Sequence, residues 1–431
     1  MPLPTTPSDL EEVYEEFRRY VLPYPTGNIH PRFWGWVMGN GTPTGMMAEM
    51  LAAAMNSNLG GLAQAGGHVE TQVIDWCKEM LGFPRESSGV LVSGGSIANL
   101  VGMTVARNSR AGYDVRADGV AGSARPMRIY ASSEVHSSVR KGVEILGLGH
   151  KALRLIPVDK EYTINVSALR EAIREDRKRG ELPLCVIGCA GTVNTGSIDP
   201  LDALADICRE EELWFHVDGA FGALAALSPA LRPLVRGMER ADSIAFDMHK
   251  WMYLQYEVGC TLVRDADAHR RSFTLTPEYL EHTTRGIAGG DIWFSDYEVQ
   301  LTRGFRALKV WMSIKEHGIE KFGRLILQNV EQARYLESLV LAHPELELVA
   351  PVPLNIVCFR FIKRSGTPEE HNTLNKELLL RLHEGGVAAP SYTTLAGTYA
   401  LRVCVTNHRS KKEDFDIFVD EVLRIGAELN R

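Results

Sequence analysis

Four short stretches of this sequence place a residue suited to chemistry directly after an apolar run. The first is the turn at residues 93–96, where two glycines precede Ser96 and the start of a helical pattern. Glycines such as Gly95 let backbone N–H groups approach an anion, and a helix N-terminus favours negative charge, so the turn suits a phosphate. It is neither a Walker loop nor GxGxxG, and a serine-capped turn without a ligand is an equally good interpretation.

The second stretch, residues 214–220, ends an apolar run in a carboxylate. Asp218 closes the run and is followed by Gly219 and Ala220. These small residues leave room for a planar ring, and a carboxylate at this place can pair with a protonated pyridine nitrogen and so strengthen an electron sink. A helix cap after a strand is the competing interpretation.

The third stretch ends in His249 and Lys250, after the apolar run 243–246. An amine held in a confined, partly desolvated site forms imines readily, whereas a lysine without such a role is a poor choice beside a core. Ser243, Asp247 and His249 surround the lysine with polar groups that can reach a phosphate. A solvated loop lysine is the alternative.

The fourth stretch places His136 shortly after the apolar run 128–131. A histidine at a strand end can stack on an aromatic ring, and it exchanges protons near neutral pH, although a lone histidine is more often structural. Together, a phosphate cradle, a ring stacker, a pyridinium partner and an imine-forming lysine are the parts that a pyridoxal 5'-phosphate (PLP) site requires. Their joint occurrence favours that cofactor over four unrelated alternatives.

The elements that position these residues alternate along the chain. Short apolar or β-branched runs, separated by helical patterns, lie at residues 89–92, 128–131, 184–188, 214–217, 243–246 and 259–264. Such alternation predicts a mainly parallel sheet covered by helices, in which ligands bind beyond the carboxyl ends of the strands. We therefore expect the four stretches to converge at one edge of the sheet.

The flanking sequence predicts further helices and loops. Helices are expected over residues 8–20, 44–58, 66–82 and about 302–341, the last with a break near Gly318. Pro- and Gly-rich residues 23–45 predict irregular structure, and residues 275–300 predict a long mobile loop. From about residue 346 the pattern is strand, helix and strand, ending in a strand at 400–405 and a helix from about 412, which suits a small α/β domain.

Composition narrows the class of protein. The 431 residues are 45% hydrophobic and 23% charged with a formal net charge of −7, as in a globular protein of two or three domains. The mild acidity argues against nucleic-acid binding. Seven dispersed cysteines without a CxxC pair suit reduced thiols, and no apolar stretch reaches the roughly 18 residues of a membrane span. We expect a cytoplasmic protein with no metal site, no nucleic-acid partner and no membrane contact.

The four stretches resemble motifs of the group II PLP-dependent decarboxylases, which include aromatic-L-amino-acid, glutamate and diaminobutyrate decarboxylases. The resemblance covers most of the chain from about His30. It is carried by a lysine motif at residues 241–251, an HVDAA-like motif at 216–220, a phosphate turn at 92–99 and a histidine motif at 133–138. Two flanking motifs, at residues 30–33 and 300–309, also match.

The resemblance implies the fold-type I architecture of PLP-dependent transferases, an α/β fold with a mainly parallel seven-stranded sheet. It predicts an N-terminal helical arm over residues 1–60, a large PLP-binding domain over 61–315 and a small C-terminal α/β domain over 316–431. It also implies a small-molecule amino-acid substrate and a homodimer with sites at the subunit interface.

The resemblance also implies roles for single residues. Lys250 is the expected Schiff-base lysine, Asp218 the pyridinium partner and His136 the ring stacker, and these three are the predicted catalytic residues. The predicted cofactor contacts are Gly95, Ser96, His136, Thr192, Asp218, Ala220, Ser243, His249 and Lys250. The predicted substrate contacts are Trp36, Phe294 and Arg402, the last where an arginine can bind a carboxylate.

One departure from the family pattern bears on the product. In the decarboxylases a loop tyrosine is thought to protonate the substrate carbon after CO2 is lost. Counting back from residues 301–303, its place falls on Phe294, or on Trp293 after a shift of one, with Tyr297 three residues on. A Phe at this position resembles the pattern of plant aldehyde synthases, which are relatives that couple decarboxylation to oxidative deamination.

Two further departures bear on the substrate. Asn56 and Asn58 stand where the aromatic decarboxylases are more apolar, and residues 64–70 keep only the final acid of the family run. Aromatic side chains such as Trp36 and Phe294 suit an aromatic substrate, whereas the asparagines suit a more polar one. The expected function is PLP-dependent decarboxylation of an L-amino acid to its amine. The alternatives are an aromatic aldehyde synthase, another PLP-dependent lyase or transaminase, and a non-catalytic PLP-binding protein.

Overall fold

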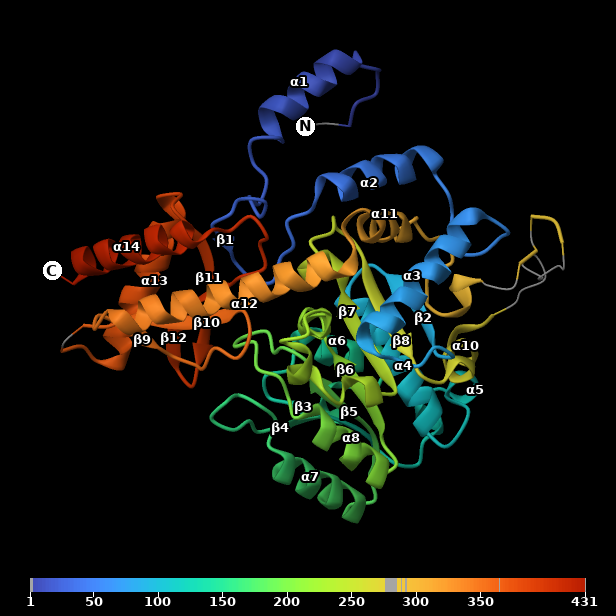
Figure 1. Cartoon of the computed structure of the whole chain (residues 1–431). Coiled ribbons are helices and arrows are strands. Elements are labelled where there is room, and N and C mark those ends of the chain that lie inside the picture. Colours follow the sequence, from blue (N-terminus) through green and yellow to red (C-terminus); the bar gives the residue numbers. More distant parts are fainter. Residues whose placement is uncertain (1–2, 276–284, 288, 291–292, 364, 431) are drawn as a thin grey trace.

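The structure is a computed structural model that describes residues 3–275, 285–287, 289–290, 293–363 and 365–430. It contains one large and one small sheet, with the long helix α12 (Ile319–Ala342) running from the first toward the second (Figure 1). Part of the loop expected at 275–300 therefore lies outside the described residues.

Seven strands form the large sheet, in the order β2-β8-β7-β6-β5-β3-β4. Their bounds are β2 (Ser88–Val92), β3 (Met127–Ser132), β4 (Leu153–Ile156), β5 (Leu182–Cys189), β6 (Trp214–Asp218), β7 (Ser243–Asp247) and β8 (Gly259–Val263). Only β8 runs antiparallel to its neighbours, so β2 points the same way as β7. The mainly parallel seven-stranded sheet is confirmed, and the carboxyl ends of six strands share one edge.

Helices cover both faces of the large sheet, because its strands are buried on both sides (Figure 1). One face carries α4 (Gly95–Arg110), α6 (Ser137–Ile145) and α10 (Ala266–Phe273). The opposite face carries α3 (Ala65–Leu81), α7 (Val166–Lys178) and α8 (Leu201–Glu210). Short helices α5 (Val115–Asp118) and α9 (Met248–Trp251) complete this part of the chain.

The small sheet has the order β1-β11-β12-β10-β9. Its strands are β1 (Phe33–Trp34), β9 (Leu346–Leu348), β10 (Ile356–Phe361), β11 (Ala389–Leu395) and β12 (Thr398–Cys404), and α13 (Pro368–Glu384) and α14 (Lys412–Leu429) pack against them. The predicted final strand and final helix are confirmed. Strand β1 comes from the segment predicted to be irregular and pairs in parallel with β11.

The remaining helices follow the expected signals. The helix α1 (Leu10–Tyr20) is capped by the Asp9 carboxylate, which accepts from the N–H of Glu11 at 2.8 Å, and none of its residues is buried. Helix α2 (Pro43–Met55) packs against α11 (Ala307–His317), which also contacts α3. Gly318, at φ +67°, separates α11 from α12, as predicted. The predicted domain limits at residues 60 and 315 stay predictions.

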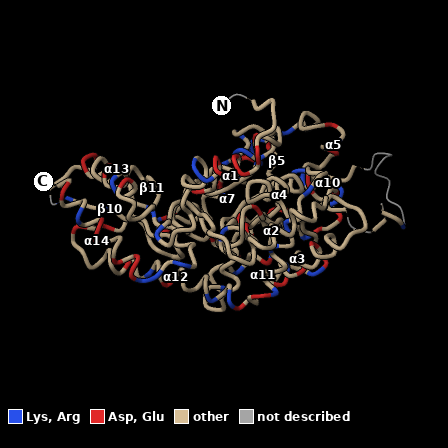
Figure 2. Tube along the Cα trace, turned by 90° about the horizontal axis from the view of Figure 1, so that it is seen from above, with Lys and Arg blue, Asp and Glu red and all other residues tan. Residues whose placement is uncertain are grey.

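In the part of the chain that the structure describes, charged residues of both signs interleave along the trace in Figure 2 and do not gather into one basic face. Among the described residues, no helix is long and apolar enough to cross a membrane.

Candidate active site

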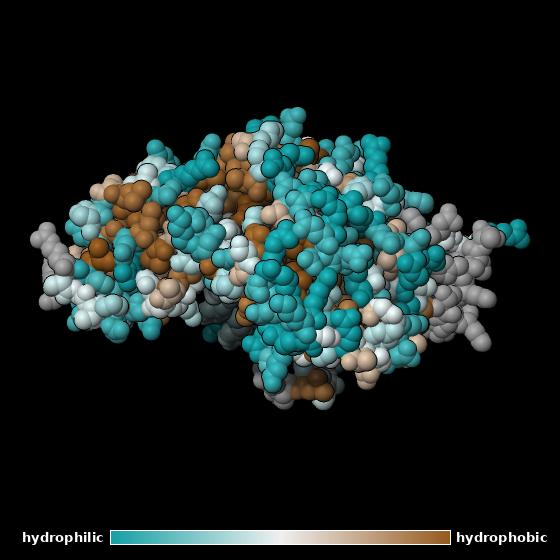
Figure 3. All heavy atoms as spheres, turned by 90° about the horizontal axis from the view of Figure 1, so that it is seen from below, coloured by the Kyte–Doolittle hydropathy of each residue, from teal (hydrophilic) through white to brown (hydrophobic). Residues whose placement is uncertain are grey.

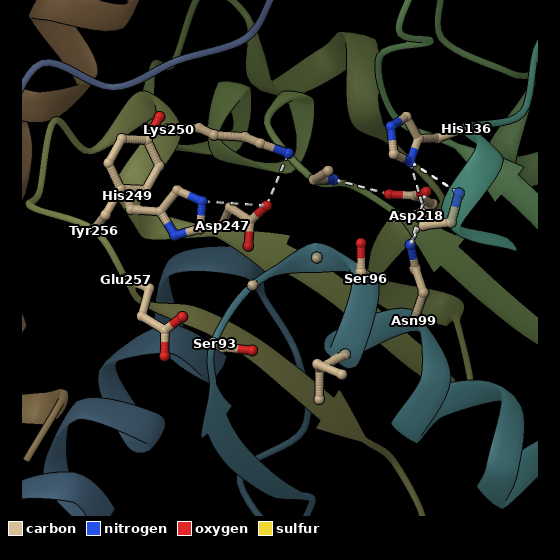
Figure 4. A pocket seen from close by; sticks show the side chains of 15 residues that line it. Ser93, Ser96, Asn99, His136, Asp218, Asp247, His249, Lys250, Tyr256 and Glu257 are labelled. Carbon is tan, nitrogen blue, oxygen red and sulfur yellow. Dashed lines mark hydrogen bonds and ion pairs between the residues drawn. The ribbon is translucent and has the colours of Figure 1, made fainter. Parts of the chain in front are cut away.

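A cavity of about 410 Å³ opens at the carboxyl edge of the large sheet (Figure 4). It is lined by Ser93, Gly94, Gly95, Ser96, Ile97, Asn99, His136, Ser138, Asp218, Ala220, Asp247, His249, Lys250, Tyr256 and Glu257. All four stretches singled out in the sequence contribute to this lining. Strand direction explains the convergence, since β2, β3, β6 and β7 all end at this edge.

Lys250 lies in the short helix that follows β7, and its Nζ points into the cavity (Figure 4). The amine is 2.8 Å from Oδ2 of Asp247, the last residue of the strand. Burial opposes a charged amine, but the carboxylates of Asp247 and Asp218 outweigh it and raise the pKa of Lys250. In this structure the lysine is therefore an ammonium paired with Asp247.

The carboxylate of Asp218 is held by two donors at the end of β6. Its Oδ2 accepts from Nδ2 of Asn99 at 3.0 Å, and its Oδ1 accepts from the N–H of Ala220 at 3.1 Å. Burial raises the pKa of Asp218, while Lys250 and the Ala220 N–H act in the opposite direction. Since each donor uses one lone pair, a further lone pair on this carboxylate is open to a ligand.

Beneath Asp218, a chain of hydrogen bonds runs back across the sheet. Asn99 Oδ1 accepts from Nε2 of His216 at 2.9 Å, and Nδ1 of His216 is 2.8 Å from the hydroxyl of Ser243. That hydroxyl in turn accepts from Nε1 of Trp214 at 2.8 Å. Burial lowers the pKa of His216 to about 3, so the ring is neutral and can donate at one nitrogen and accept at the other.

Ser243 is therefore not a phosphate contact, and that prediction is wrong. It is the first residue of β7, whereas the cavity lies at the last residue of the same strand. Its side chain is fully buried between the sheet and α4. The sequence shows a serine close to the lysine motif but does not show that the length of the strand separates it from the site.

His136 stands at the N-terminus of α6 above Asp218 (Figure 4). Its Nδ1 accepts from the backbone N–H of Ser138 at 3.2 Å and lies 2.8 Å from the same residue's hydroxyl. Burial lowers the pKa of His136, with Asp218 acting against it. The histidine is therefore a neutral ring whose Nε2 carries the hydrogen, and it is fixed in orientation by the cap.

Thr192 follows β5, but it does not line the cavity. Its hydroxyl is 3.0 Å from that of Thr195 and accepts from the N–H of Ser197 at 3.1 Å, so it closes a turn. The predicted contact between Thr192 and the cofactor ring stays a prediction.

None of the three predicted substrate residues lines the cavity. Arg402 is buried and donates to backbone carbonyls, among them Val193 at 2.9 Å and Trp36 at 3.0 Å. Trp36 itself is 62% exposed. Phe294 is buried against the guanidinium of Arg303, 5.2 Å from ring centroid to Cζ. Their roles toward a substrate stay predictions.

Several lining residues were missed by the sequence reasoning. Asn99 stands one helical turn after Ser96, so the spacing along α4 gave a signal that places both on one face. Tyr256 lies before β8, and its ring centroid is 4.7 Å from that of His249. Tyr256 and Glu257 carry no motif that a single sequence reveals.

Comparison with known proteins decides the family. The model of the pyridoxal-dependent decarboxylase conserved domain matches residues 1–362. The chain belongs to this family. Pyridoxal-dependent decarboxylases similar to it include an aromatic-L-amino-acid decarboxylase of Bacillus atrophaeus, 36% identical over 99% of this chain and 88% of the relative.

Two further relatives of this decarboxylase show how widely the fold is shared. A phenylacetaldehyde synthase of Arabidopsis thaliana is 28% identical over 97% of this chain and 87% of its own. The crystal structure of Oryza sativa TDC with PLP and tryptamine superposes with a TM-score of 0.92 at 27% identity, covering 100% of this chain and 90% of that one. The fold-type I architecture and the PLP cofactor follow from these matches.

The residues of the cavity fit PLP. The site offers an amine at Lys250, an open carboxylate lone pair at Asp218, a flat neutral ring at His136 and the N-terminus of α4 beside Gly95 and Ser96. A helix N-terminus suits a phosphate, and a carboxylate suits the pyridine nitrogen. Seven predicted cofactor contacts lie together here, namely Gly95, Ser96, His136, Asp218, Ala220, His249 and Lys250. Their individual roles stay predictions.

Proposed function

We propose that this PLP-dependent decarboxylase converts an aromatic L-amino acid to its amine. The observation that carries the proposal is the grouping of Lys250, Asp218 and His136 around one cavity at the sheet edge. An aromatic substrate is supported by the name of the Bacillus atrophaeus relative and by the tryptamine that accompanies PLP in the crystal structure of Oryza sativa TDC.

Each side chain has a defined task in this proposal. PLP, when bound, supplies a protonated pyridine ring that withdraws electrons from the substrate carbon. Lys250 provides the amine that holds the cofactor, Asp218 keeps the proton on the ring nitrogen, and His136 fixes the ring plane. The chain of hydrogen bonds through Asn99 holds the Asp218 carboxylate in place, so that little reorganisation is needed during the reaction.

A second candidate function is that of an aldehyde synthase. It is favoured by Phe294, which has no phenol to give a proton at the expected loop position, and by the similarity to the Arabidopsis thaliana synthase. An aldehyde synthase would consume one O2 and one water for each amino acid, and would release aldehyde, ammonia and peroxide together with CO2.

The two candidates differ in their products. Aromatic and polar L-amino acids should be incubated with the holoenzyme, and CO2, amine and peroxide measured in the same samples. We expect an aromatic substrate to give CO2 and amine in equal amounts with little peroxide. Peroxide equal to CO2 would establish the second candidate, and turnover without CO2 would exclude both in favour of another lyase or a transaminase.

Lys250→Ala tests the assignment of the lysine. We expect the variant to lose the visible absorption of the bound cofactor and to lose turnover by at least about a thousandfold, because no other amine lines the described cavity. Spectra and turnover should be compared with those of Lys315→Ala, a substitution on α11 outside the cavity. Normal turnover and an unchanged absorption band in the Lys250 variant would contradict the proposal.

A further inference from the structure

Asp247 has a buried carboxylate in which one oxygen accepts a hydrogen bond and the other accepts none from the described residues. Oδ2 accepts from Lys250 Nζ at 2.8 Å, and the residue is 1% exposed. Among the described residues, no group donates a hydrogen bond to Oδ1. A buried carboxylate oxygen without a donor is costly, so this oxygen points to a partner that comes with the ligand.

The carboxylate of Asp247 lies directly against the glycine turn at the start of α4. A Cβ at Gly95 would stand 2.9 Å from Oδ2, and one at Gly94 would stand 3.6 Å from Oδ1. On the other side, a Cβ at Gly259 would stand 2.7 Å from Oδ1. Three glycines therefore make room for the carboxylate, and it borders the place where the turn is expected to receive a phosphate.

The cavity has few cations to balance a phosphate dianion. Its lining includes the acids Asp218, Asp247 and Glu257, and Lys250 is the one lysine or arginine among the described lining residues. Burial lowers the pKa of His136 and of His249, so both rings are neutral at pH 8.

Tyr256 also faces this group of charges. Burial raises the pKa of Tyr256, so its phenol is neutral as well. At pH 8 the lining thus carries more negative than positive charge before a phosphate arrives, and a dianion beside the ionised Asp247 would be repelled.

His249 needs no extra proton to face a phosphate. Its Nδ1 accepts from the N–H of Val258 at 3.1 Å, which places the hydrogen of the neutral ring on Nε2. Nε2 lies 3.8 Å from Oδ2 of Asp247, beside the glycine turn. The neutral histidine is already a donor toward the turn, so Asp247 is the group that lacks a hydrogen there.

We propose that Asp247 takes up one proton from solvent when a phosphate group binds at the glycine turn, and that its carboxyl then faces the phosphate as a neutral donor. The proposal rests on the cofactor assignment of the cavity and extends it, since loading of PLP becomes a proton-consuming step. The balance is one carboxylate and one proton giving one carboxyl group, with no other bond changed.

Calorimetry with pyridoxine 5'-phosphate measures this proton directly. The probe keeps the phosphate but has an alcohol in place of the aldehyde, so Lys250 does not react with it. At pH 8 a phosphate monoester is a dianion, since its second pKa is about 6. Titrating enzyme stripped of PLP in buffers of different ionisation enthalpy should show uptake of about one proton per site, whereas pyridoxine, which lacks the phosphate, should show none.

Asp247→Asn is the decisive variant. We expect it to bind pyridoxine 5'-phosphate without proton uptake and at least about tenfold more tightly at pH 8, because the amide donates without a proton. The affinity of the wild type should fall by about tenfold per pH unit above neutrality, and that of the variant should stay level. Glu257→Gln, which removes another acid of the lining, should keep both the uptake and the pH dependence.

The outcomes separate cleanly. Zero uptake in the wild type, or full uptake in Asp247→Asn, overturns the proposal while leaving the cofactor assignment intact. No binding of the probe to the wild type contradicts the cofactor assignment itself. If Asp247→Asn does not fold, infrared difference spectra of the wild type decide, because the proposal requires a new protonated-carboxyl band on binding and its absence overturns it.

Discussion

At the scale of residues, Asp218 is held by a chain of donors that begins far from the cavity. Trp214 donates to Ser243, Ser243 to His216, His216 to Asn99 and Asn99 to Asp218, so each group is satisfied in one direction. A buried network in which every group is hydrogen-bonded fixes one geometry. Removing one member leaves its neighbours without a hydrogen-bond partner.

Ser243→Ala tests this chain. The substitution leaves the indole N–H of Trp214 and Nδ1 of His216 without their buried partner, so we expect a loss of about 1 to 3 kcal/mol in the free energy of unfolding. PLP affinity should fall several-fold as Asp218 loses support. Urea unfolding and PLP titration measure the two effects, and Ser338→Ala, at an exposed position of α12, should change neither. Unchanged affinity in Ser243→Ala would separate the chain from the cofactor site.

The residue scale also shows what a single sequence can predict about the site. The positions of Lys250, Asp218 and His136 are predictable because each ends or follows a strand whose end is visible in the apolar pattern. Ser243 is misplaced because proximity along a strand is not proximity to its carboxyl end, each residue adding about 3.3 Å. Asp247 is visible as a polar neighbour of Lys250, but its pairing with the amine depends on the turn into α9, which the pattern does not encode.

At the scale of elements, a buried charge cluster links the segment after Phe294 to the glycine turn. Arg303 donates to both carboxylate oxygens of Glu70 on α3 and to Glu298, and it also donates to the carbonyl of Leu91 on β2. Leu91 stands two residues before the glycine turn. Glu70, the acid kept from the family run, thus links α3, β2 and the segment around Glu298.

Arg303→Met tests how much the cluster stabilises the fold. The variant leaves Glu70 and Glu298 buried without their cation, and we expect a loss of about 3 to 5 kcal/mol in the free energy of unfolding. Arg324→Met, which breaks an exposed pair on α12, should cost less than about 1 kcal/mol. Chemical denaturation of the two variants is the measurement. Equal losses of unfolding free energy in the two variants would show that the buried cluster stabilises the fold no more than an exposed ion pair does.

His269 gives the fold a dependence on acid. Its Nδ1 is 2.8 Å from the Ser88 hydroxyl and its Nε2 is 2.8 Å from the carbonyl of Tyr297, and burial lowers its pKa to about 4. The unfolded chain binds a proton below about pH 6.5, whereas the folded chain resists it until about pH 4. The contribution of His269 to the free energy of unfolding is therefore present at pH 7 and is lost as the pH falls from about 6.5 to about 4.

We expect this histidine to account for up to about 3 kcal/mol of the acid loss, at about 1.4 kcal/mol per pH unit. His269→Gln should lose less stability than the wild type between pH 7 and pH 4.5, as measured by urea unfolding at both values. His216, whose pKa burial lowers to about 3, contributes in the same direction and remains in both proteins. A variant with the full wild-type acid loss would exclude His269 as the source.

Most elements are predictable because their apolar periodicity is strong. Two strands that the pattern does not predict are β4 and β1. Strand β4 contains only one buried residue, Ile156, so it lacks the pattern of an interior strand. Strand β1 is two residues long and owes its conformation to pairing with β11, which no local signal reports.

At the scale of the whole molecule, the N-terminal helix leaves an apolar face in solvent. Leu10 is 81% exposed and Phe17 42%, and α2 exposes Met46, Met47 and Met50. Figure 1 places α1 away from the rest of the chain, and Figure 3 shows further apolar surface on another side. The expected homodimer remains a prediction, and these faces are surfaces that a second copy would cover.

Deletion of residues 1–22 tests that prediction. We expect the full chain to sediment at twice its monomer mass and the shortened chain to dissociate at concentrations at least about tenfold higher, because the apolar face of α1 is lost. Leu341→Ser, which removes an exposed apolar side chain on α12, should leave the sedimentation unchanged. A monomeric full chain would contradict the homodimer, and a dimer unaffected by the deletion would assign the interface elsewhere.

The parallel pairing of β1 with β11 has a consequence for how the protein is made. Arg32 donates to the carbonyl of Val387, 355 residues further along the sequence. The indole of Trp34 stacks on the ring of Phe415, with 4.7 Å between the ring centroids. A ribosome adds roughly 5 to 20 residues per second, so β1 is synthesised roughly 20 to 70 seconds before its partner strand. During that time the nascent chain carries Trp34 uncovered, and the small sheet closes only after β11 and β12 have been synthesised.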